Sequence, residues 1–251
     1  MAKDLFSNQA SIYAQYRPGY PHELFEHILR YVNNKDTAWD CATGNGQAAL
    51  ELARYFEKVI ATDLSEKQLQ QAPPHEKITW QASTAENTPF TDNSFDCITV
   101  AQAYHWFQFD AFHKEVVRVA KPQAVIAIWG YSLVVCNSEA LNNIIKTFYR
   151  ETVGPYWDKE RRYIDDHYTT VPFPYDVLPS KEFKINVQWN RQQLIGYFNT
   201  WSSVQHYIKA NQYNPVNELA TAMERVWSGN DVMDFYFPLF LKLGRVRKSE
   251  V

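Results

Sequence analysis

Short apolar runs alternate with amphipathic stretches through the first half of the chain. The segments 46–55 and 110–120 repeat apolar residues at helical spacing. The run at 124–130 is apolar throughout, as is typical of a parallel strand that is covered on both faces. This alternation predicts a βαβαβ order and therefore a doubly wound, mostly parallel sheet. The runs of strand length lie at 38–41, 58–63, 78–82, 95–101 and 124–130.

The second half of the chain is less regular. Residues 154–180 combine prolines with many aromatic side chains, which predicts an insertion that roofs a pocket rather than a linker. Residues 184–189 alternate like a strand with one wet face. Helices are expected at about 191–210 and 216–227. A last strand is expected at 235–243, near an edge or a bulge because it contains a proline.

The length of 251 residues fits one large domain or two small ones. We predict a single domain over residues 1–251, with a cofactor-binding core at 1–130. Insertions and a cap over the substrate pocket are expected at 131–230, and the last strand and tail at 231–251. Whether the protein is a monomer or a homodimer stays open.

Composition narrows the partners and the compartment. The formal net charge is −3 and no region is strongly basic, which argues against a nucleic-acid partner. No stretch approaches a membrane span, so no membrane partner is expected. The three cysteines, Cys41, Cys97 and Cys136, lack metal-type spacing. They predict reduced thiols in a cytoplasmic protein, and no metal site is expected.

The strand at 38–41 runs into a turn with two glycines, Gly44 and Gly46. Glycine is favoured there because it adopts unusual backbone angles and lets a ligand touch the main chain. The pattern alone is weak, since nicotinamide, flavin and S-adenosylmethionine folds all use it. Asp40 sharpens it: a fixed carboxylate disfavours a pyrophosphate but favours the ammonium and sulfonium of S-adenosylmethionine.

Asp63 ends the second predicted strand, 17 residues after Gly46. This is close to the spacing at which an acid accepts hydrogen bonds from ribose hydroxyls. The alternative is that Asp63 caps the following helix. Because Ser65 could cap that helix instead, the ribose role is the better interpretation.

Polar and aromatic side chains gather just after the fourth predicted strand, at 102–107. Ligands of open α/β sheets bind at this carboxyl edge. His105 is the candidate general base there, and a packing histidine beside Trp106 is an equally good interpretation. Near the N-terminus, Arg17 could bind a substrate carboxylate bidentately or simply anchor its segment.

The ordered set of these motifs resembles the class I S-adenosylmethionine-dependent methyltransferases of the type 11 group. It is most similar to the small-molecule branch typified by trans-aconitate methyltransferase. The resemblance implies a Rossmann-like, seven-stranded sheet that ends in an antiparallel pair, here supplied by 183–189 with 235–243. For this chain we expect a helical and aromatic cap over that sheet. The matching stretches are 16–21, 40–46, 63–65, 85–90, 101–107, 200–202 and 238–240.

The resemblance implies S-adenosylmethionine as cofactor, S-adenosylhomocysteine as product, and a role for eleven residues. The methionine moiety is expected to contact Asp40, Gly44, Gly46 and Gln102, and the ribose to contact Asp63. The adenine is expected to contact Leu64, Thr84 and Ala85. Closure over the cofactor is expected from Tyr13, Tyr16 and Arg17. Expected pocket walls, with core packing as the alternative for each, are Tyr104, His105, Trp106, Tyr131 and Trp201.

Two residues depart from the family pattern. Ala42 stands where many relatives have a third glycine, a change that the backbone should tolerate. Thr84 stands where many have aspartate, so a charge-assisted bond to the adenine amino group becomes a hydroxyl contact.

The predicted function is in-line methyl transfer to a small-molecule acceptor, through a carboxylate or hydroxyl oxygen. The alternatives are a non-catalytic S-adenosylmethionine-binding or partner subunit and, less favoured, an NAD-dependent oxidoreductase. The sequence does not identify the acceptor.

Overall fold

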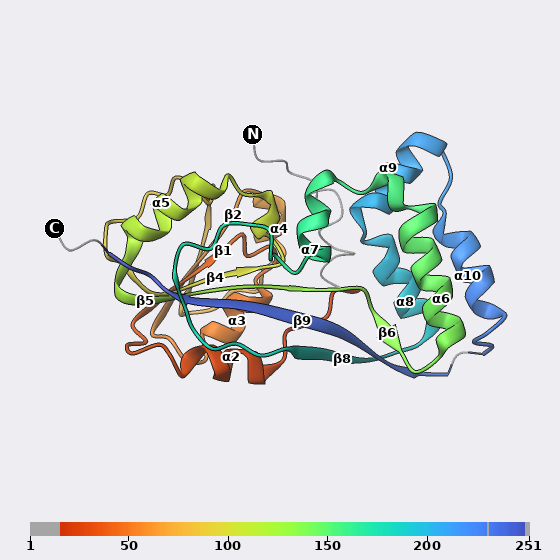
Figure 1. The fold of residues 1–251 in the computed structure, drawn as a ribbon, viewed down its shortest axis with the longest axis horizontal. Coiled ribbons are helices and arrows are strands. Elements are labelled where there is room, and N and C mark those ends of the chain that lie inside the picture. Colours follow the sequence, from red (N-terminus) through yellow and green to blue (C-terminus); the bar gives the residue numbers. More distant parts are fainter. Residues whose placement is uncertain (1–15, 230, 249–251) are drawn as a thin grey trace.

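The computed structural model describes residues 16–229 and 231–248, which form one mixed sheet flanked by helices (Figure 1). Strand pairing follows the order β3-β2-β1-β4-β5-β9-β6, with β7 and β8 also paired to β9. Neighbours among the first five strands are parallel. The predicted doubly wound sheet is therefore confirmed. These five strands are β1 (Thr37–Cys41), β2 (Lys58–Asp63), β3 (Ile78–Ala82), β4 (Phe95–Ala101) and β5 (Ala120–Tyr131).

The long strand β9 (Met233–Arg245) runs antiparallel to β5 and to β8 (Phe183–Trp189), which confirms the antiparallel end of the sheet. The two-residue strands β6 (Val135–Cys136) and β7 (Asp176–Val177) also pair with β9. Pro238 pairs with Lys184 of β8 and lies one residue before the pairing of β9 with β5 begins at Leu239. Its carbonyl accepts the backbone N–H of Ser132, just beyond the end of β5.

Helices cover both faces of the sheet, and successive side chains of β5 pack against helices on opposite faces. Trp129 faces α2 (His22–Leu29) and packs edge-on against Phe25, with ring centroids 5.8 Å apart. Ile128, its neighbour in the strand, belongs to the cluster beneath α5 (Phe109–Val119). Successive side chains point to opposite faces, so an apolar run predicts cover on both sides. The shorter helices beside the sheet are α3 (Gln47–Leu52) and α4 (Glu66–Leu69).

Four helices form a lobe at one end of the sheet, at the right in Figure 1. Ile145, Leu194 and Met223 of this lobe are buried in the same apolar cluster as Trp129. The helical lobe and the sheet therefore share one core. The helices are α6 (Glu139–Thr147), α8 (Arg191–Asn199), α9 (Ser202–Asn211) and α10 (Val216–Glu224).

The single helix expected at about 191–210 is wrong, because the chain breaks into α8 and α9. The Thr200 hydroxyl donates to the carbonyl of Tyr197 and closes α8. Trp201 is extended, which lets its ring pack against Phe198 with centroids 4.9 Å apart. Burial of a large aromatic ring outweighs continuation of the helix.

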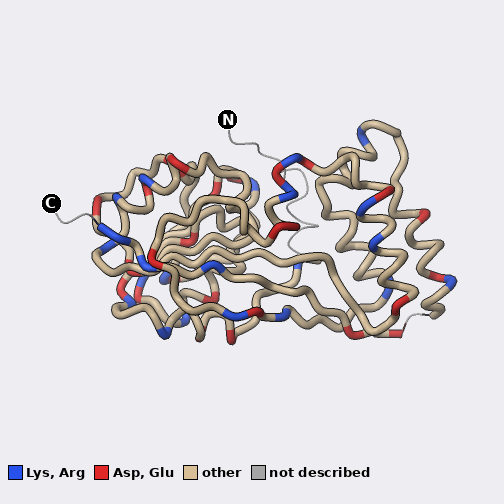
Figure 2. Tube along the Cα trace, viewed as in Figure 1, with Lys and Arg blue, Asp and Glu red and all other residues tan. Residues whose placement is uncertain are grey.

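The segment between α6 and β7 is built from short turns. It includes a π-helical turn (Phe148–Thr152), two 3-10 turns (Gly154–Tyr156 and Lys159–Arg161) and α7 (Arg162–Asp165). Within the described residues no helix has the length and hydrophobicity to cross a membrane. In Figure 2, Lys and Arg are interspersed with Asp and Glu over the described part of the chain rather than gathered in one region.

Candidate active site

A cavity opens at the carboxyl edge of β1 to β4, where the chain leaves each of the four parallel strands. Ligands of doubly wound sheets bind at this edge. Nine of the residues predicted for the site line the cavity: Arg17, Gly44, Asp63, Leu64, Thr84, Ala85, Gln102, His105 and Trp106. The structure thus brings together side chains that lie far apart in the sequence.

Asp63 lies on the cavity wall at the end of β2. One of its carboxylate oxygens accepts the backbone N–H of Gly44 at 2.8 Å, and the other accepts that of Ser65 at 2.8 Å. Gly44 has φ +60°, and a Cβ added there would meet nothing within 4 Å. Open space above this backbone lets a ligand approach the main chain directly. Ser65, not Asp63, accepts the backbone N–H of Gln68 and caps α4.

Gly46 is needed for packing rather than for the cavity wall. It has φ +90°, and a Cβ there would lie 2.3 Å from the indole ring of Trp80. Any side chain would therefore push the β3 tryptophan away from the turn. Ala42, in the third glycine position, adopts φ +55°. The backbone does keep this left-handed conformation without glycine, at an expense of about 1 kcal/mol or more.

Asp40 is fully buried and does not line the cavity. Its two oxygens accept hydroxyl bonds from Thr43 at 2.5 Å and from Thr99 at 2.7 Å. Burial raises the pKa of Asp40 to about 6, although these two hydrogen bonds oppose the shift. Asp40 therefore ties the glycine turn to β4 from below and sets a negative charge under it.

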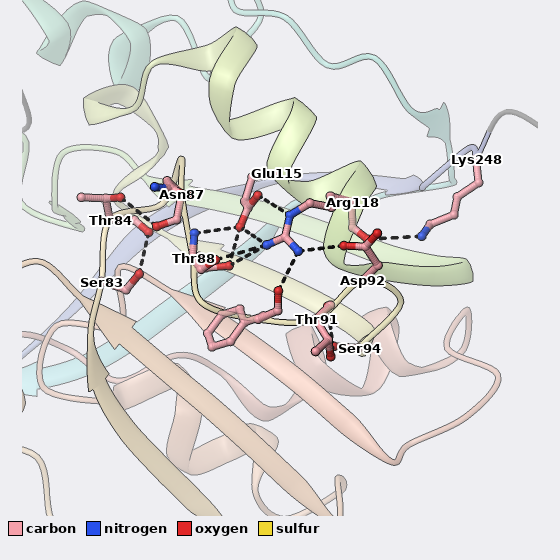
Figure 3. A network of polar contacts seen from close by, with 11 residues as sticks. Ser83, Thr84, Asn87, Thr88, Thr91, Asp92, Ser94, Glu115, Arg118 and Lys248 are labelled. Carbon is pink, nitrogen blue, oxygen red and sulfur yellow. Dashed lines mark hydrogen bonds and ion pairs between the residues drawn. The ribbon is translucent and has the colours of Figure 1, made fainter.

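The loop that follows β3 forms another wall of the cavity. Leu64 and Ala85 contribute apolar surface, and the Thr84 hydroxyl donates to the carbonyl of Asn87. Figure 3 shows how a polar network fixes this loop to α5. The Arg118 guanidinium contacts both oxygens of Glu115, at 2.7 and 2.9 Å.

Arg118 also reaches the loop itself. Its guanidinium donates to the Phe90 carbonyl at 2.6 Å and to Asp92 at 2.8 Å. Thr88 donates both its backbone N–H and its hydroxyl to Glu115. These bonds hold the backbone of residues 88–92 in place, and with it the cavity-lining residues just before them.

Gln102 clamps the ends of β4 and β5 together. Its amide nitrogen donates to the carbonyl of Tyr131 at 3.3 Å, and its amide oxygen accepts the Tyr131 backbone N–H at 2.8 Å. Like Ala42, Gln102 has a positive φ, here +56°. Two residues with strained backbones, one after β1 and one after β4, therefore line the cavity, as is common at functional sites.

His105 lines the cavity but is only 6% exposed. Its Nδ1 lies 2.8 Å from the hydroxyl of Tyr168, and its ring lies 4.7 Å from that of Trp106. Burial, together with the nearby cation of Arg161, lowers the pKa of His105 to about 3. The imidazole is therefore neutral at physiological pH.

The architecture agrees with what is known of other proteins. A family model described as "Methyltransferase domain" matches residues 39–128. A Dictyostelium discoideum protein named as a methyltransferase is 31% identical over 249 residues, which cover 96% of this chain and 95% of that protein. The chain belongs to the class I S-adenosylmethionine-dependent methyltransferases.

Two further comparisons are consistent with this family. The solved structure of an Anaeromyxobacter dehalogenans protein, described as a type II methyltransferase, superposes with a TM-score of 0.85 at 32% identity, covering 93% of this chain and 100% of that one. A ubiquinone/menaquinone biosynthesis C-methyltransferase of Rickettsia bellii is 28% identical over 195 residues, 71% of this chain and 77% of that protein. The finer resemblance to the trans-aconitate branch stays a prediction.

Arg17 of this methyltransferase joins the N-terminal segment to the helical lobe. Its guanidinium donates to the hydroxyl of Tyr131 at 2.6 Å and lies 5.2 Å from the ring centroid of Tyr197. The ring of Tyr16 lies so close to Gly196 that a Cβ there would approach it to 2.5 Å. Tyr16 therefore packs on α8 rather than on the cavity. Tyr13 lies outside the described residues.

Three of the expected pocket walls do not line the cavity of the methyltransferase. Tyr104 is fully buried, and its hydroxyl contacts His113 Nε2 and the carbonyl of Pro172. Tyr131 is held behind the wall by Arg17. Trp201 forms a layer behind another tryptophan, Trp157, whose centroid lies 5.3 Å away. For these three residues, the core-packing alternative describes the observed contacts, because their side chains contact other protein groups behind the cavity wall.

Four cavity-lining residues of the cap were not among the predicted site residues, although 154–180 was expected to roof a pocket. They are Trp157, Asp158, Arg161 and Ser202. The Arg161 guanidinium lies 4.7 Å from the ring of Trp157, and its Nε donates to the hydroxyl of Tyr149 at 3.0 Å. In the sequence, residues 158–162 look like a solvated charge run, so nothing local marked Arg161.

Within residues 16–229 and 231–248, no group of three or more His, Cys, Asp or Glu side chains is placed to hold a metal ion.

Proposed function

We propose that this methyltransferase transfers the methyl group of S-adenosylmethionine to an oxygen of a small-molecule acceptor, with a carboxylate as the favoured group. The observation that carries the cofactor half is Asp63. Its carboxylate is held on the cavity wall by Gly44 and Ser65, at the end of the second strand, where an acid can accept ribose hydroxyls.

The rest of the cofactor fits the walls around Asp63. Leu64 and Ala85 offer apolar surface to an adenine ring, with Thr84 as a hydroxyl contact at its edge. Gly44 borders a small adjoining hollow that Tyr20 and Asn45 also line, which suits the methionine end. The buried carboxylate of Asp40 lies beneath this turn and favours a positive ligand above it.

The acceptor side is formed by the cap and the end of β4. Trp106 and Trp157 supply aromatic walls, and Arg161 supplies a cation that two rings and a tyrosine hydroxyl hold in place. A guanidinium held in this way can pair with a carboxylate of the acceptor. We propose residues 131–230 as the cap over this half of the site.

A carboxylate acceptor also suits the weak basicity of His105. Bound S-adenosylmethionine supplies an electrophilic methyl group on its sulfonium. A hydroxyl acceptor would have to lose its proton, whereas a carboxylate would not. Because the pKa of His105 is lowered to about 3, its imidazole is poorly suited to take that proton at neutral pH. The residues here orient the acceptor and exclude water, and positioning alone can lower the barrier by up to roughly 7–11 kcal/mol.

The three cysteines support a reducing compartment. Cys41, Cys97 and Cys136 are all buried and unpaired. Free buried thiols are typical of cytoplasmic proteins, so we propose a cytoplasmic enzyme.

Calorimetric titration of the full chain with S-adenosylmethionine and S-adenosylhomocysteine, with NAD as a control ligand, tests the cofactor. We expect both adenosyl ligands to bind and NAD to fail. Asp63→Ala should weaken binding by about 10- to 100-fold, the loss of hydrogen bonds to a charged group. The matched control Asp166→Ala removes an exposed carboxylate outside the cavity and should change nothing.

Failure of both adenosyl ligands to bind the folded protein would favour a partner subunit, and binding of NAD alone would favour an oxidoreductase. The acceptor is tested by transfer of a radiolabelled methyl group to panels of carboxylic acids and of phenols. Labelled ester from the acids, stable at neutral pH and released by alkali, is the expected result. If only the phenols gave labelled product, as ethers, the acceptor would be a hydroxyl and the carboxylate proposal would be wrong.

A further inference from the structure

We propose that Tyr168 is a positioning residue that fixes His105 as a neutral hydrogen-bond donor, with Nε2–H directed into the acceptor side of the cavity. His105 then binds an oxygen of the acceptor and does not act as a general base. This inference rests on the proposed function for its meaning, but the hydrogen-bond arrangement can be tested without any substrate.

The contact between the two residues is buried and well defined. Tyr168 is fully buried, and its hydroxyl lies 2.8 Å from His105 Nδ1. Burial raises the pKa of the Tyr168 hydroxyl well above its usual range, so the phenol keeps its proton. The pair is therefore a neutral tyrosine beside a neutral histidine.

The direction of this hydrogen bond follows from what surrounds the phenol. The backbone N–H of His105 also faces the Tyr168 oxygen and opposes the rise of its pKa, as a donor does. With that donor on its oxygen, the hydroxyl satisfies its own proton by donating to Nδ1. A neutral imidazole that accepts at Nδ1 carries its proton on Nε2. This arrangement leaves no buried polar group of the pair unpaired.

The Nε2 atom is open to the cavity. His105 lines the cavity, and its Nδ1 edge is taken by Tyr168. No hydrogen bond to Nε2 exists among the described residues, and Nε2 is not among the buried polar atoms that lack a partner. It is therefore accessible and can donate to a ligand atom.

The backbone around Tyr168 is strained in a way that fixes the phenol. His167 and Tyr168 have φ values of +51° and +55°, two successive left-handed residues without glycine. Each such residue is disfavoured by about 1 kcal/mol or more. The strain is held by the Lys242 ammonium, which donates to the Tyr168 carbonyl at 2.8 Å, and by Phe240, which stacks on the ring of His167.

The positive charge near His105 is consistent with a neutral imidazole that donates from Nε2. Arg161 is the nearby cation that, after burial, lowers the pKa of the imidazole. Two neighbouring groups, Arg161 and Nε2–H, thus offer only donors to the cavity. Such a pair is complementary to an oxygen that carries negative charge, and a carboxylate supplies two of them.

The test is a long-range 1H–15N correlation spectrum of full-length protein labelled with 15N-histidine, recorded with S-adenosylhomocysteine from pH 5 to 8. The His105→Gln variant identifies the signals by their disappearance. We expect an unprotonated Nδ1 and a protonated Nε2 throughout this range. In Tyr168→Phe, the His105 signals should shift toward a mixture of tautomers, while affinity for S-adenosylhomocysteine stays within about twofold.

The matched control is Tyr175→Phe, which removes another buried hydroxyl bonded to a histidine, 2.6 Å from His113 Nδ1. It should leave the His105 signals unchanged. A proton on Nδ1, or titration of His105 between pH 6 and 7, would overturn the proposal. Those outcomes differ from failure of the proposed function, which is read from cofactor binding by calorimetry.

Discussion

At the scale of single residues, the carboxylates of Asp63 and Asp40 differ because of what surrounds them. Asp63 lies on the wall and accepts two backbone N–H groups. Asp40 is fully buried, and desolvation outweighs its hydrogen bonds from the Thr43 and Thr99 hydroxyls and from the Ala49 backbone, so its pKa is raised to about 6. A carboxylate that is held charged in the interior at neutral pH destabilises the fold unless a ligand uses its charge.

Replacement of Asp40 by Asn should stabilise the ligand-free protein at neutral pH. The folded-state pKa of about 6 exceeds the reference value of 3.8, so the stabilisation from protonation is complete below pH 4 and is lost as pH rises through 6. The difference between these two pKa values corresponds to roughly 3 kcal/mol. In urea titrations, the free energy of unfolding of Asp40→Asn should therefore rise relative to that of the wild type between pH 4 and 7. Above pH 7 the difference should stay constant.

The same variant should bind S-adenosylmethionine less tightly, because the charge beneath the turn is gone. Thr99→Val, which removes one hydroxyl from Asp40 and keeps the charge, is the matched control. It should lower stability without a comparable loss of affinity. Equal stability differences between Asp40→Asn and wild type at pH 4 and pH 7 would contradict the raised pKa.

At the scale of elements, the loop after β3 depends on a helix that never touches the cavity. Arg118 and Glu115 on α5 bind its backbone at Thr88 and Phe90. The planar guanidinium makes several of these bonds at once, which a lysine ammonium cannot do. The wall of the cavity where we propose that adenine binds is therefore held in place through α5 (Figure 3).

We expect Arg118→Lys to loosen this loop while the fold is retained. Hydrogen exchange at residues 83–94 should accelerate, and affinity for S-adenosylhomocysteine should fall by up to roughly fivefold to thirtyfold, the equivalent of one or two hydrogen bonds of about 1 kcal/mol. Arg191→Lys is the matched control, since Arg191 bonds Trp227 and Glu224 far from the loop. Unchanged exchange in Arg118→Lys would show that other contacts hold the loop.

At the scale of the whole molecule, the sheet and the helical lobe are joined by one apolar cluster. Phe235, Phe237 and Leu239 of β9 lie in it together with Leu194 of α8 and Ile145 of α6. A continuous core of this kind predicts that the two parts unfold together.

Hydrogen exchange in increasing urea should therefore give the same midpoint for peptides from β5 and from α8. Ile145→Ala, in the lobe, should destabilise by about 2–5 kcal/mol and lower both midpoints equally. Val117→Ala, at a partly exposed position, is the control and should change stability by less than about 0.5 kcal/mol. A lower midpoint in α8 alone would show that the lobe folds as a separate unit.

Local pattern determined much of this protein from sequence alone. The bounds of β2, β3 and β4 match the predicted strand runs. For β2 and β4 the reason is that a strand buried on both faces is apolar along most of its length. β3 lies at the edge of the sheet and is mostly half-exposed. The ends of parallel strands meet at one edge, so the predicted chemistry at Gly44, Asp63 and Gln102 had to converge there.

Only the tertiary structure decided which side chains face the cavity and which face the core. Tyr104, Trp106, Trp157 and Trp201 are all aromatic residues in aromatic-rich stretches of the sequence. Only Trp106 and Trp157 line the cavity. The same holds for Tyr168, because its partner His105 lies 63 residues away in the sequence and its own backbone is in a strained turn. Long-range packing chooses among equivalent aromatic and charged residues, and a local pattern carries no record of that choice.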